Sequence, residues 1–261
     1  MATIPAISVV TGAAGGIGGG LVDVLLKRGD RVIAADINME KLEHLRESLL
    51  ESGGLTLSEH EDRFMTIELD VSSSTSWHTL RDRSRKRFGD PNVLVNNAGI
   101  SPKHDGLKLQ GVDIPIEEWD AVLAVNLTGA FLGMQTLVPA MQRNGYGRIV
   151  NISSAAARVG GRIAGMHYSA SKTGMLGLTR GFAWELASSG ITVNSVAPGR
   201  IDLGMAQQTT EEVNRRILGT IPVGRMGTPE DVGRMVAFLT ATENGFITGA
   251  TFDVNGGTHM Q

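Results

Sequence analysis

The sequence predicts an α/β protein with one doubly wound parallel sheet of about seven strands and helices on both faces. Two observations predict this fold. Short apolar runs, rich in valine and isoleucine, alternate with longer helical patterns along the 261 residues of the chain. Most of these runs are apolar almost throughout, which is typical of parallel strands that are buried on both faces.

Each predicted strand is a short apolar segment, and each predicted helix carries apolar residues at helical spacing. The predicted strands cover residues 7–10, 31–35, 63–69, 92–95, 147–152, 192–197 and 251–254. The predicted helices cover residues 16–28, 39–52, 73–88, 117–143, 167–189 and 229–240. Because no repeat or low-complexity linker interrupts this alternation, residues 1–261 are expected to form a single domain.

Three segments are expected to form loops on the substrate side. Residues 99–114 and 199–227 are long stretches that do not fit the strand–helix rhythm, and residues 155–167 follow the fifth strand. Long loops in a compact domain are often functional. All three follow strands, at the carboxyl edge where open α/β sheets bind their ligands.

Composition excludes several classes of protein. Hydrophobic residues make up 41% and charged residues 20%, which is typical of a soluble globular protein. The net charge of −3 and the lack of a long basic stretch argue against nucleic acid as a partner. There is no cysteine, and the six histidines lack metal-ligand spacing, so no metal is expected. Neither a signal peptide nor a membrane span is apparent, so the expected location is cytoplasmic.

A glycine-rich turn between the first predicted strand and helix predicts a phosphate-binding loop. Gly12, Gly16 and Gly18 allow a tight turn that brings the helix N-terminus, with its free N–H groups, close to an anion. Asp36 ends the second strand, 18 residues beyond Gly18, close to the ~20 expected for a ribose-binding acid. The pattern predicts a Rossmann-type dinucleotide site. The alternatives are a simple tight turn and, for Asp36, a helix cap.

Asp36 also indicates NAD as the cofactor. A carboxylate can accept hydrogen bonds from both hydroxyls of the adenosine ribose, and it repels a 2′-phosphate. Gly15 and Ile37 stand where an NADP site would be expected to carry a cation. NADP is therefore disfavoured.

Tyr168 and Lys172 form the candidate reacting pair. Residues four apart share one face of a helix, so both side chains would point into the same space. A phenol with a pKa of about 10 is a poor base at neutral pH, and a nearby ammonium lowers that pKa. The same spacing is common on solvated helix surfaces, so the pair indicates a catalytic role only together with other motifs in the sequence.

With these motifs the chain resembles the short-chain dehydrogenase/reductase family from about residue 7 to residue 257, in particular its 3-oxoacyl-carrier-protein reductases and NAD-dependent alcohol dehydrogenases. The matching motifs are Thr11-Gly12-x3-Gly16-x-Gly18, Asp70-Val71, Asn96-Asn97-Ala98-Gly99, Asn126, Ser153-Ser154, Tyr168-x3-Lys172, Pro198-Gly199, Asp231 and Gly249 through Gly257. The resemblance implies a homotetramer (or a homodimer) in which the helices around 117–143 and 167–189 pack across subunits. Phe131 and Trp184 are expected in the core or at such an interface.

The resemblance also implies a role for each matched residue. Tyr168 would exchange a proton with the substrate oxygen, Lys172 would hold the nicotinamide ribose, and Ser154 would orient that oxygen. Asn126 would fix a water that connects Lys172 to solvent. The residues implied to contact the cofactor are Gly12, Gly16, Ile17, Gly18, Asp36, Asp70, Val71, Asn97, Ala98, Gly99, Tyr168, Lys172, Pro198, Gly199 and Ile201. The alternatives are that Ser154 is a helix cap and that Asn126 is a buried side chain satisfied by backbone.

Two positions depart from the family pattern. Ser154 lies one residue farther from Tyr168 than in most relatives, and position 155 is Ala155, which we interpret as a one-residue insertion after the serine. Leu203 stands where relatives often carry a threonine that holds the nicotinamide carboxamide. Because Leu203 cannot form that hydrogen bond, backbone groups or Asn194 are the alternatives for this contact.

The sequence says less about the substrate. Several cations fall in the expected substrate loops, and they either meet an anionic substrate or are solvated charges. They are Lys103, His104, Arg158, Arg162, His167 and Arg200. The predicted function is an NAD(H)-dependent oxidoreductase that moves a hydride between nicotinamide and a small secondary alcohol or ketone, such as a sugar, polyol or hydroxy acid. The first alternative is a 3-oxoacyl-thioester reductase, which is disfavoured because such relatives usually use NADPH. A non-catalytic NAD-binding regulator and a methyltransferase are further alternatives.

Overall fold

The computed structural model describes residues 6–51, 57–160, 164–203, 215 and 218–260. Within these residues, seven strands form one sheet in which every adjacent pair is parallel. The strand order is β3-β2-β1-β4-β5-β6-β7, which confirms the predicted Rossmann-like fold. The order of the strands reverses between β1 and β4, and such a switch point is where doubly wound sheets bind their ligands.

The described elements follow the predicted alternation. The strands are β1 (Ile7–Thr11), β2 (Arg31–Asp36), β3 (Phe64–Glu68), β4 (Val93–Asn96), β5 (Gly147–Ile152), β6 (Ile191–Pro198) and β7 (Thr251–Val254). The α-helices are α1 (Gly16–Arg28), α2 (Met39–Glu51), α3 (Leu57–Arg63), α4 (Ser74–Arg87), α5 (Ile116–Leu123), α6 (Gly129–Asn144), α7 (Ala156–Val159), α8 (Met166–Leu186) and α10 (Pro229–Leu239). Short helical turns are η1 (Gly111–Asp113) and η3 (Ala187–Ser189), and η2 (Ala124–Thr128) is a π-helix.

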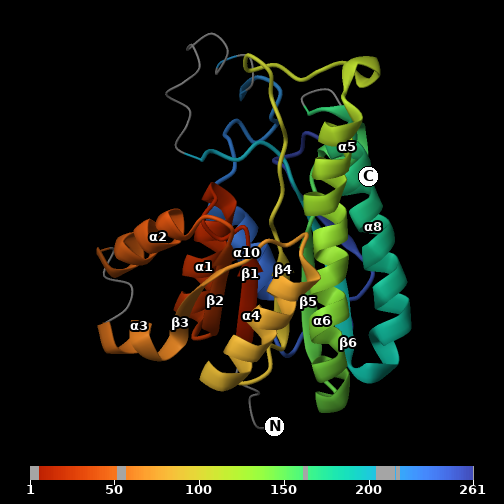
Figure 1. Cartoon of the computed structure of the whole chain (residues 1–261). Helices are drawn as coiled ribbons and strands as arrows, with labels where there is room; N and C mark the ends of the chain where they lie inside the picture. Colours follow the sequence, from red (N-terminus) through yellow and green to blue (C-terminus); the bar gives the residue numbers. More distant parts are fainter. Residues whose placement is uncertain (1–5, 52–56, 161–163, 204–214, 216–217, 261) are drawn as a thin grey trace.

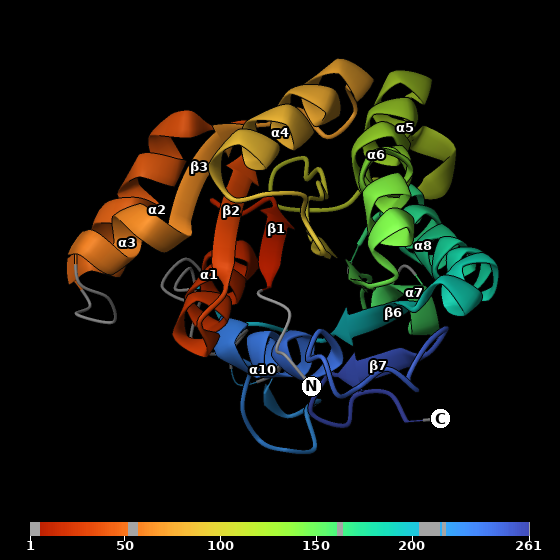
Figure 2. The same cartoon turned by 90° about the horizontal axis from the view of Figure 1, so that it is seen from below.

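The sheet is the middle layer of three. Helices α4, α6 and α8 cover one face, and α1 and α10 pack together on the other (Figures 1 and 2). The segment that follows β4 extends past the carboxyl end of that strand before it reaches α5 (Figure 1). The loops after the strands therefore gather above one edge of the sheet.

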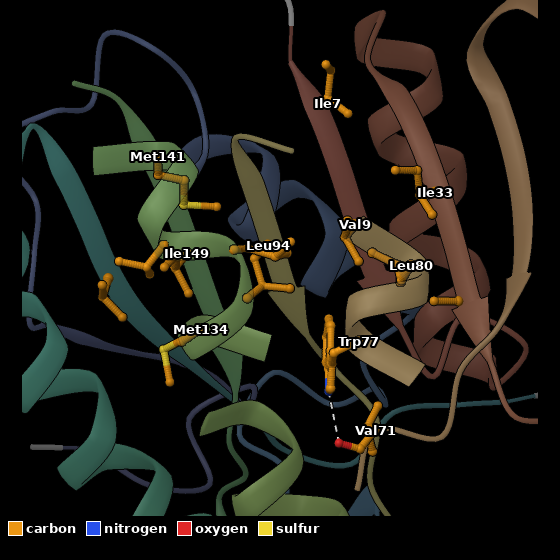
Figure 3. Close-up of a cluster of buried hydrophobic side chains, with 14 of the residues drawn as sticks. Ile7, Val9, Ile33, Val71, Trp77, Leu80, Leu94, Met134, Met141 and Ile149 are labelled. Carbon is orange, nitrogen blue, oxygen red and sulfur yellow. Dashed lines mark hydrogen bonds between the residues drawn. The ribbon is translucent and has the colours of Figure 1, made fainter. Parts of the chain in front are cut away.

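Two apolar clusters sandwich the sheet because successive strand residues point to opposite faces. Val9 and Leu94 belong to the cluster under α4, α6 and α8, whereas their neighbours Val10 and Val95 belong to the cluster under α1 and α10. Trp77 of α4 is fully buried in the first cluster, and its indole N–H donates to the Val71 carbonyl at 2.9 Å (Figure 3). These clusters hold the strand ends that carry the site.

Three helical features differ from the sequence prediction. The predicted helix 117–143 is interrupted by the π-helix Ala124–Thr128, which hydrophobic periodicity cannot reveal. The predicted strand 63–69 is shorter, because Arg63 ends α3, a helix that the sequence did not predict. A single turn, α7, lies within the predicted loop 155–167.

The continuous helical segment Ile116–Asn144 has 29 residues and is long and apolar enough to cross a membrane. Half of its most apolar window is buried inside the structure, and α6 packs on β4 and β5. A core helix of a globular protein gives the same signal, which accounts for its apolar composition.

Candidate active site

A cavity of about 470 Å³ opens at the carboxyl edge of the sheet, across the switch point between β1 and β4. It gathers most of the residues that the sequence singled out. The residues of the candidate site that line it are Gly12, Gly16, Ile17, Gly18, Asp36, Asp70, Val71, Asn97, Ala98, Gly99, Ser154, Tyr168, Lys172, Pro198 and Gly199. Gly15, Ile37, Leu69, Ile100, Val125, Ile152, Ser153 and Leu203 complete the lining. Asn126 and Ile201 lie outside this lining.

The glycine turn is built for close approach of backbone to a ligand. Gly12 has a φ of 63°, in the left-handed region that glycine adopts at no cost. A Cβ at Gly18 would lie 2.1 Å from the Gly12 carbonyl oxygen, so a side chain there would force the turn apart. Gly15 is the N-cap of α1 and provides no side-chain cap, so N–H groups of the first turn remain available to an anion.

Asn97 and Thr11 hold this turn in place. The Asn97 side-chain amide donates to the carbonyls of Thr11 and Gly12 at 2.9 and 3.0 Å. The Thr11 hydroxyl in turn accepts the backbone N–H groups of Asn97 and Ala98, each at 3.0 Å. The end of β4 thus fixes the turn after β1, and Asn97 supports the glycine turn while it also lines the cavity.

Asp36 lies at the end of β2 beside this turn. One of its oxygens accepts the Ala14 N–H at 3.1 Å and the other accepts the Asn38 N–H at 3.0 Å. The helix-cap alternative does not hold, because Asn38 accepts the Lys41 N–H at 2.9 Å just before α2. Each carboxylate oxygen keeps capacity for a further hydrogen bond. These acceptor oxygens fit a ribose diol at one end of the cavity, and the N–H groups of the glycine turn fit a pyrophosphate.

Asp70 and Val71 form the next wall of the cavity. Asp70 accepts hydrogen bonds from the Ser72 backbone N–H at 2.9 Å and from the Ser72 hydroxyl at 2.6 Å. Val71 is buried, and a Cβ at Gly129 of α6 would lie 2.8 Å from it. The glycine lets α6 approach this wall closely.

Tyr168, Lys172 and Ser154 meet at the opposite end of the cavity. The Lys172 ammonium lies 5.8 Å from the centre of the Tyr168 ring and donates to the Ile152 carbonyl at 2.8 Å. Lys172 is 3% exposed, so the pair does not lie on a solvated helix surface. The Ser154 hydroxyl is hydrogen-bonded to the Tyr168 phenol. The three side chains therefore line the same part of the cavity.

Burial controls the ionisation of this pair. It lowers the pKa of Lys172 to about 8, because the ammonium loses its hydration. Burial raises the pKa of Tyr168, and the hydrogen bond from Ser154 acts in the opposite direction. Ser154 therefore acts on the pKa of Tyr168 in the direction that the sequence predicted for Lys172.

The two adjacent serines have different environments. Ser153 is buried, and its hydroxyl donates to the Lys172 backbone carbonyl at 2.8 Å, so it ties α8 to β5. Ser154 faces Tyr168, and its hydroxyl also accepts the Ala156 N–H at 3.1 Å at the start of α7. Ser154 is not the N-cap of α7, because that position is Ala155, so its bond to Ala156 is a local contact beside its contact with Tyr168.

Asn126 is fully buried behind Gly99 and lies in the π-helix. Its amide donates to the Ile100 carbonyl at 3.0 Å and to the Ser171 hydroxyl at 3.1 Å, and its oxygen accepts the Ile100 N–H at 2.7 Å. A Cβ at Gly99 would lie 3.3 Å from both the Asn126 oxygen and the Lys172 ammonium nitrogen. Asn126 is therefore a buried side chain that is hydrogen-bonded to backbone, as in the alternative interpretation, and it also lies near Lys172.

At the expected nicotinamide side, the side chains of Ile201 and Asn194 lie outside the cavity lining. Ile201 packs against the apolar cluster on the α1 face and pairs with Gly227, so its side chain belongs to the core and not to the cavity lining. Asn194 is excluded as a carboxamide partner, because it is fully buried. Its amide donates to the Ile247 carbonyl at 2.8 Å, and its oxygen accepts the Ala250 N–H at 3.1 Å.

Leu203 lines the cavity from the opposite side. A Cβ at Gly16 would lie 2.7 Å from its side chain, so Leu203 covers the glycine turn. The residues that follow it, up to position 214, lie outside the described part of the chain. Leu203 therefore gives this wall of the cavity an apolar side chain, where a threonine would have given a polar one.

Several of the cations expected at the substrate side have partners that the sequence did not reveal. Arg158 pairs with Asp253 at 3.4 Å, and both His104 and His167 pair with Glu118, each at 2.7 Å. Glu118 did not stand out in the sequence, because its partners lie far away along the chain. Arg162 lies outside the described residues.

Comparison with known proteins agrees with this geometry. A family model described as enoyl-(acyl carrier protein) reductase matches residues 12–259. The chain belongs to the short-chain dehydrogenase/reductase family. It is therefore an oxidoreductase.

Two curated relatives of this family match the chain along almost its whole length. The acetoacetyl-CoA reductase of Cupriavidus necator is 37% identical over 255 residues, which cover 97% of this chain and 98% of the relative. The 3-oxoacyl-[acyl-carrier-protein] reductase of Escherichia coli is 34% identical over 254 residues, which cover 97% of each protein.

Two solved structures share the fold. A 3-oxoacyl-[acyl-carrier protein] reductase from Brucella melitensis is 36% identical, with a TM-score of 0.89, and covers 98% of this chain and 92% of its own. A second Brucella melitensis structure of such a reductase, with bound NAD, is 36% identical with a TM-score of 0.87 and the same coverage.

Proposed function

We propose that this oxidoreductase reduces the 3-oxo group of a thioester substrate with NADH, through Tyr168, Ser154 and Lys172. The observation that carries the proposal is that these three side chains and Asp36 line one cavity, at opposite ends. The thioester comes from the relatives, which are reductases of acetoacetyl-CoA and of 3-oxoacyl carrier proteins. They favour this substrate class over the small alcohols, sugars and polyols that the sequence alone favoured.

The choice of NADH rests on Asp36 and its surroundings. The sequence disfavoured acyl reduction because such relatives usually use NADPH. A Brucella melitensis 3-oxoacyl reductase with bound NAD removes this objection in principle. Here the acid at the end of β2 and the exposed Ile37 beside it provide no cation for a 2′-phosphate.

Positively charged residues in the expected substrate loops support a substrate that is attached to an anionic carrier. Burial lowers the pKa of Lys103, and the nearby charges of Lys108 and Arg200 lower it further. Lys108 and Arg200 therefore both lie within electrostatic reach of Lys103, and the three cations come from two of the expected substrate loops. A phosphate or an acidic protein surface on the carrier would be attracted to these cations.

The chain's own residues would act on the substrate oxygen. Bound NADH supplies a hydride from C4 of its nicotinamide ring. The Ser154 hydroxyl donates a hydrogen bond to the 3-oxo oxygen and orients the carbonyl. The Tyr168 phenol gives its proton to that oxygen as the alcohol forms. The Lys172 ammonium stabilises the negative charge left on the phenol, and Asn126 lies near Lys172, behind Gly99.

A substrate screen tests this function. NADH oxidation is followed with acetoacetyl-CoA and a 3-oxoacyl carrier protein, and NAD⁺ reduction with sugars, polyols, hydroxy acids and simple secondary alcohols, each repeated with the NADP form. We expect the thioesters with NADH to give the highest kcat/KM. The Tyr168→Phe variant is the control and should lose turnover while it still binds NADH. Faster turnover of a polyol or sugar than of either thioester would contradict the proposal.

A further inference from the structure

Glu118 connects two histidines at the junction between the substrate-side loop and the helix that carries Tyr168. One carboxylate oxygen of Glu118 pairs with Nε2 of His167 at 2.7 Å, and the other pairs with Nε2 of His104 at 2.7 Å. His167 is 2% exposed and lies in the first turn of α8, directly before Tyr168. His104 is an exposed residue of the loop between β4 and α5. One side chain of α5 thus holds two segments that are remote in sequence.

The contacts of His167 define its tautomer. Nδ1 of His167 accepts the backbone N–H of Tyr168 at 2.8 Å. A ring nitrogen that accepts carries no hydrogen, so Nε2 carries it and donates it to Glu118. Gly165, the N-cap of α8, provides no side chain to accept an N–H of the first turn, and His167 supplies that acceptor instead. The imidazole therefore caps the helix at Tyr168 itself.

Glycine at position 165 makes room for the ring. A Cβ there would lie 2.3 Å from Cε1 of His167. The ring is therefore seated by the Gly165 backbone, the Tyr168 N–H and the Glu118 carboxylate. Hydrogen bonds from His167 and His104 also hold the pKa of Glu118 below its ordinary value, so the carboxylate stays charged through neutral pH.

The segment that His104 joins to this point is a defined hairpin. The backbone groups of His104 and Leu107 exchange hydrogen bonds at 2.8 and 2.9 Å. Asp105 and Gly106 between them have φ values of 50° and 78°, as in a tight hairpin turn. Its connection to Glu118 gives the hairpin a fixed position relative to α8.

We propose that Glu118 and His167 are positioning residues that fix the Tyr168 phenol, and that His104 extends the same connection to a substrate-side hairpin. The effect on turnover rests on the proposed function, whereas the effect on Tyr168 does not. Without Glu118, the buried Nε2–H of His167 loses its acceptor, and the first turn of α8 and the hairpin lose their common anchor.

Kinetics of matched variants test the connection. Glu118→Ala should lower kcat about 10-fold or more, because small displacements of reacting groups are costly, while the Kd for NADH stays within about twofold. His104→Ala should raise the KM for the thioester more than it lowers kcat. Glu117→Ala, the exposed neighbour on α5, is the control. His167→Asn keeps an acceptor near the Tyr168 N–H and should retain more kcat than His167→Ala.

A readout without turnover tests the position of Tyr168 directly. The chain has two tyrosines, so a Tyr146→Phe background leaves Tyr168 as the single one. With ¹³C at the phenolic carbon, Glu118→Ala should shift the Tyr168 resonance and its titration, whereas Glu117→Ala should leave both unchanged.

The outcomes separate cleanly. An unchanged Tyr168 resonance with Glu118→Ala overturns the proposal, and so does a kcat loss accompanied by equal losses in NADH binding and thermal stability. If the unsubstituted enzyme does not reduce thioesters, the proposed function fails, and the Tyr168 resonance still decides whether Glu118 positions the phenol.

Discussion

Two adjacent serines, Ser153 and Ser154, have different hydrogen-bond partners and therefore different expected roles. Ser153 donates to the backbone of Lys172, and Ser154 is hydrogen-bonded to Tyr168. Ser154→Ala should therefore lower kcat by about 10²-fold or more, as loss of a hydrogen bond to the reacting oxygen does. Ser153→Ala should lower stability by about 1 kcal/mol with little change in kcat. Steady-state kinetics and urea unfolding check both, and the reverse order of kcat losses would move the role to Ser153.

Asp36 carries the choice of cofactor at the residue scale. Asp36→Ala removes an acceptor for the ribose hydroxyls and a charge that repels a 2′-phosphate. The variant should bind NADH more weakly while the affinity for NADPH falls less or rises. Fluorescence titration with both cofactors measures the ratio of the two dissociation constants. An unchanged ratio would show that other groups select the cofactor.

Lys172 makes stability depend on pH. Its pKa of about 8 in the folded protein lies below the ordinary value of 10.5, so between these values the unfolded chain binds more protons. The free energy of unfolding should therefore rise with pH across this window, by up to about 3 kcal/mol. Below pH 8 the destabilisation caused by burying the charged ammonium is fully present. Lys172→Met should flatten this rise in urea unfolding measured from pH 7 to 10.5. An equally steep rise in the variant would assign it to other groups.

At the scale of elements, two neighbouring glycines of α1 test how closely the helix packs. A Cβ at Gly20 would lie 2.3 Å from Cβ of Pro229, at the rigid start of α10, whereas at Gly19 it would lie 3.2 Å from the flexible end of Leu45. Gly20→Ala should lower the free energy of unfolding by about 1–3 kcal/mol through overpacking. Gly19→Ala should cost less, because alanine favours the helix. Equal effects in urea unfolding would contradict the close contact.

The π-helix Ala124–Thr128 determines how Asn126 is placed. It interrupts an otherwise continuous helix at Asn126, and π-helical turns are frequently found at functional sites. Asn126 thereby exchanges hydrogen bonds with Ile100, beyond the end of β4. The sequence identified Asn126 through family resemblance, but the helical irregularity around it leaves no trace in hydrophobic periodicity.

At the scale of the whole molecule, the outer face formed by α6 and α8 carries exposed aromatic residues. Trp184 of α8 is 90% exposed, and Phe131 of α6 lies 6.1 Å from Phe182 between ring centres. This face belongs to the helices that the family resemblance predicts to pack across subunits. Trp184→Glu should therefore shift the protein toward smaller species in analytical ultracentrifugation, whereas Val112→Glu, equally exposed elsewhere, should not. A monomeric unsubstituted protein would contradict the predicted homotetramer.

The sequence by itself determined the alternation of strands and helices, the parallel sheet and the glycine turn, and it singled out Asp36 and the Tyr168–Lys172 pair. These features depend on local patterns, because burial on both faces makes a strand apolar and a tight turn requires glycine. The tertiary structure alone decided that Ile201 joins the core, that Asn194 is already satisfied, that burial lowers the pKa of Lys172 and that Glu118 holds His104 and His167. Each of these findings depends on which distant segments pack together and on how much water they exclude. The spacing of residues along the chain does not reveal that packing or that exclusion of water.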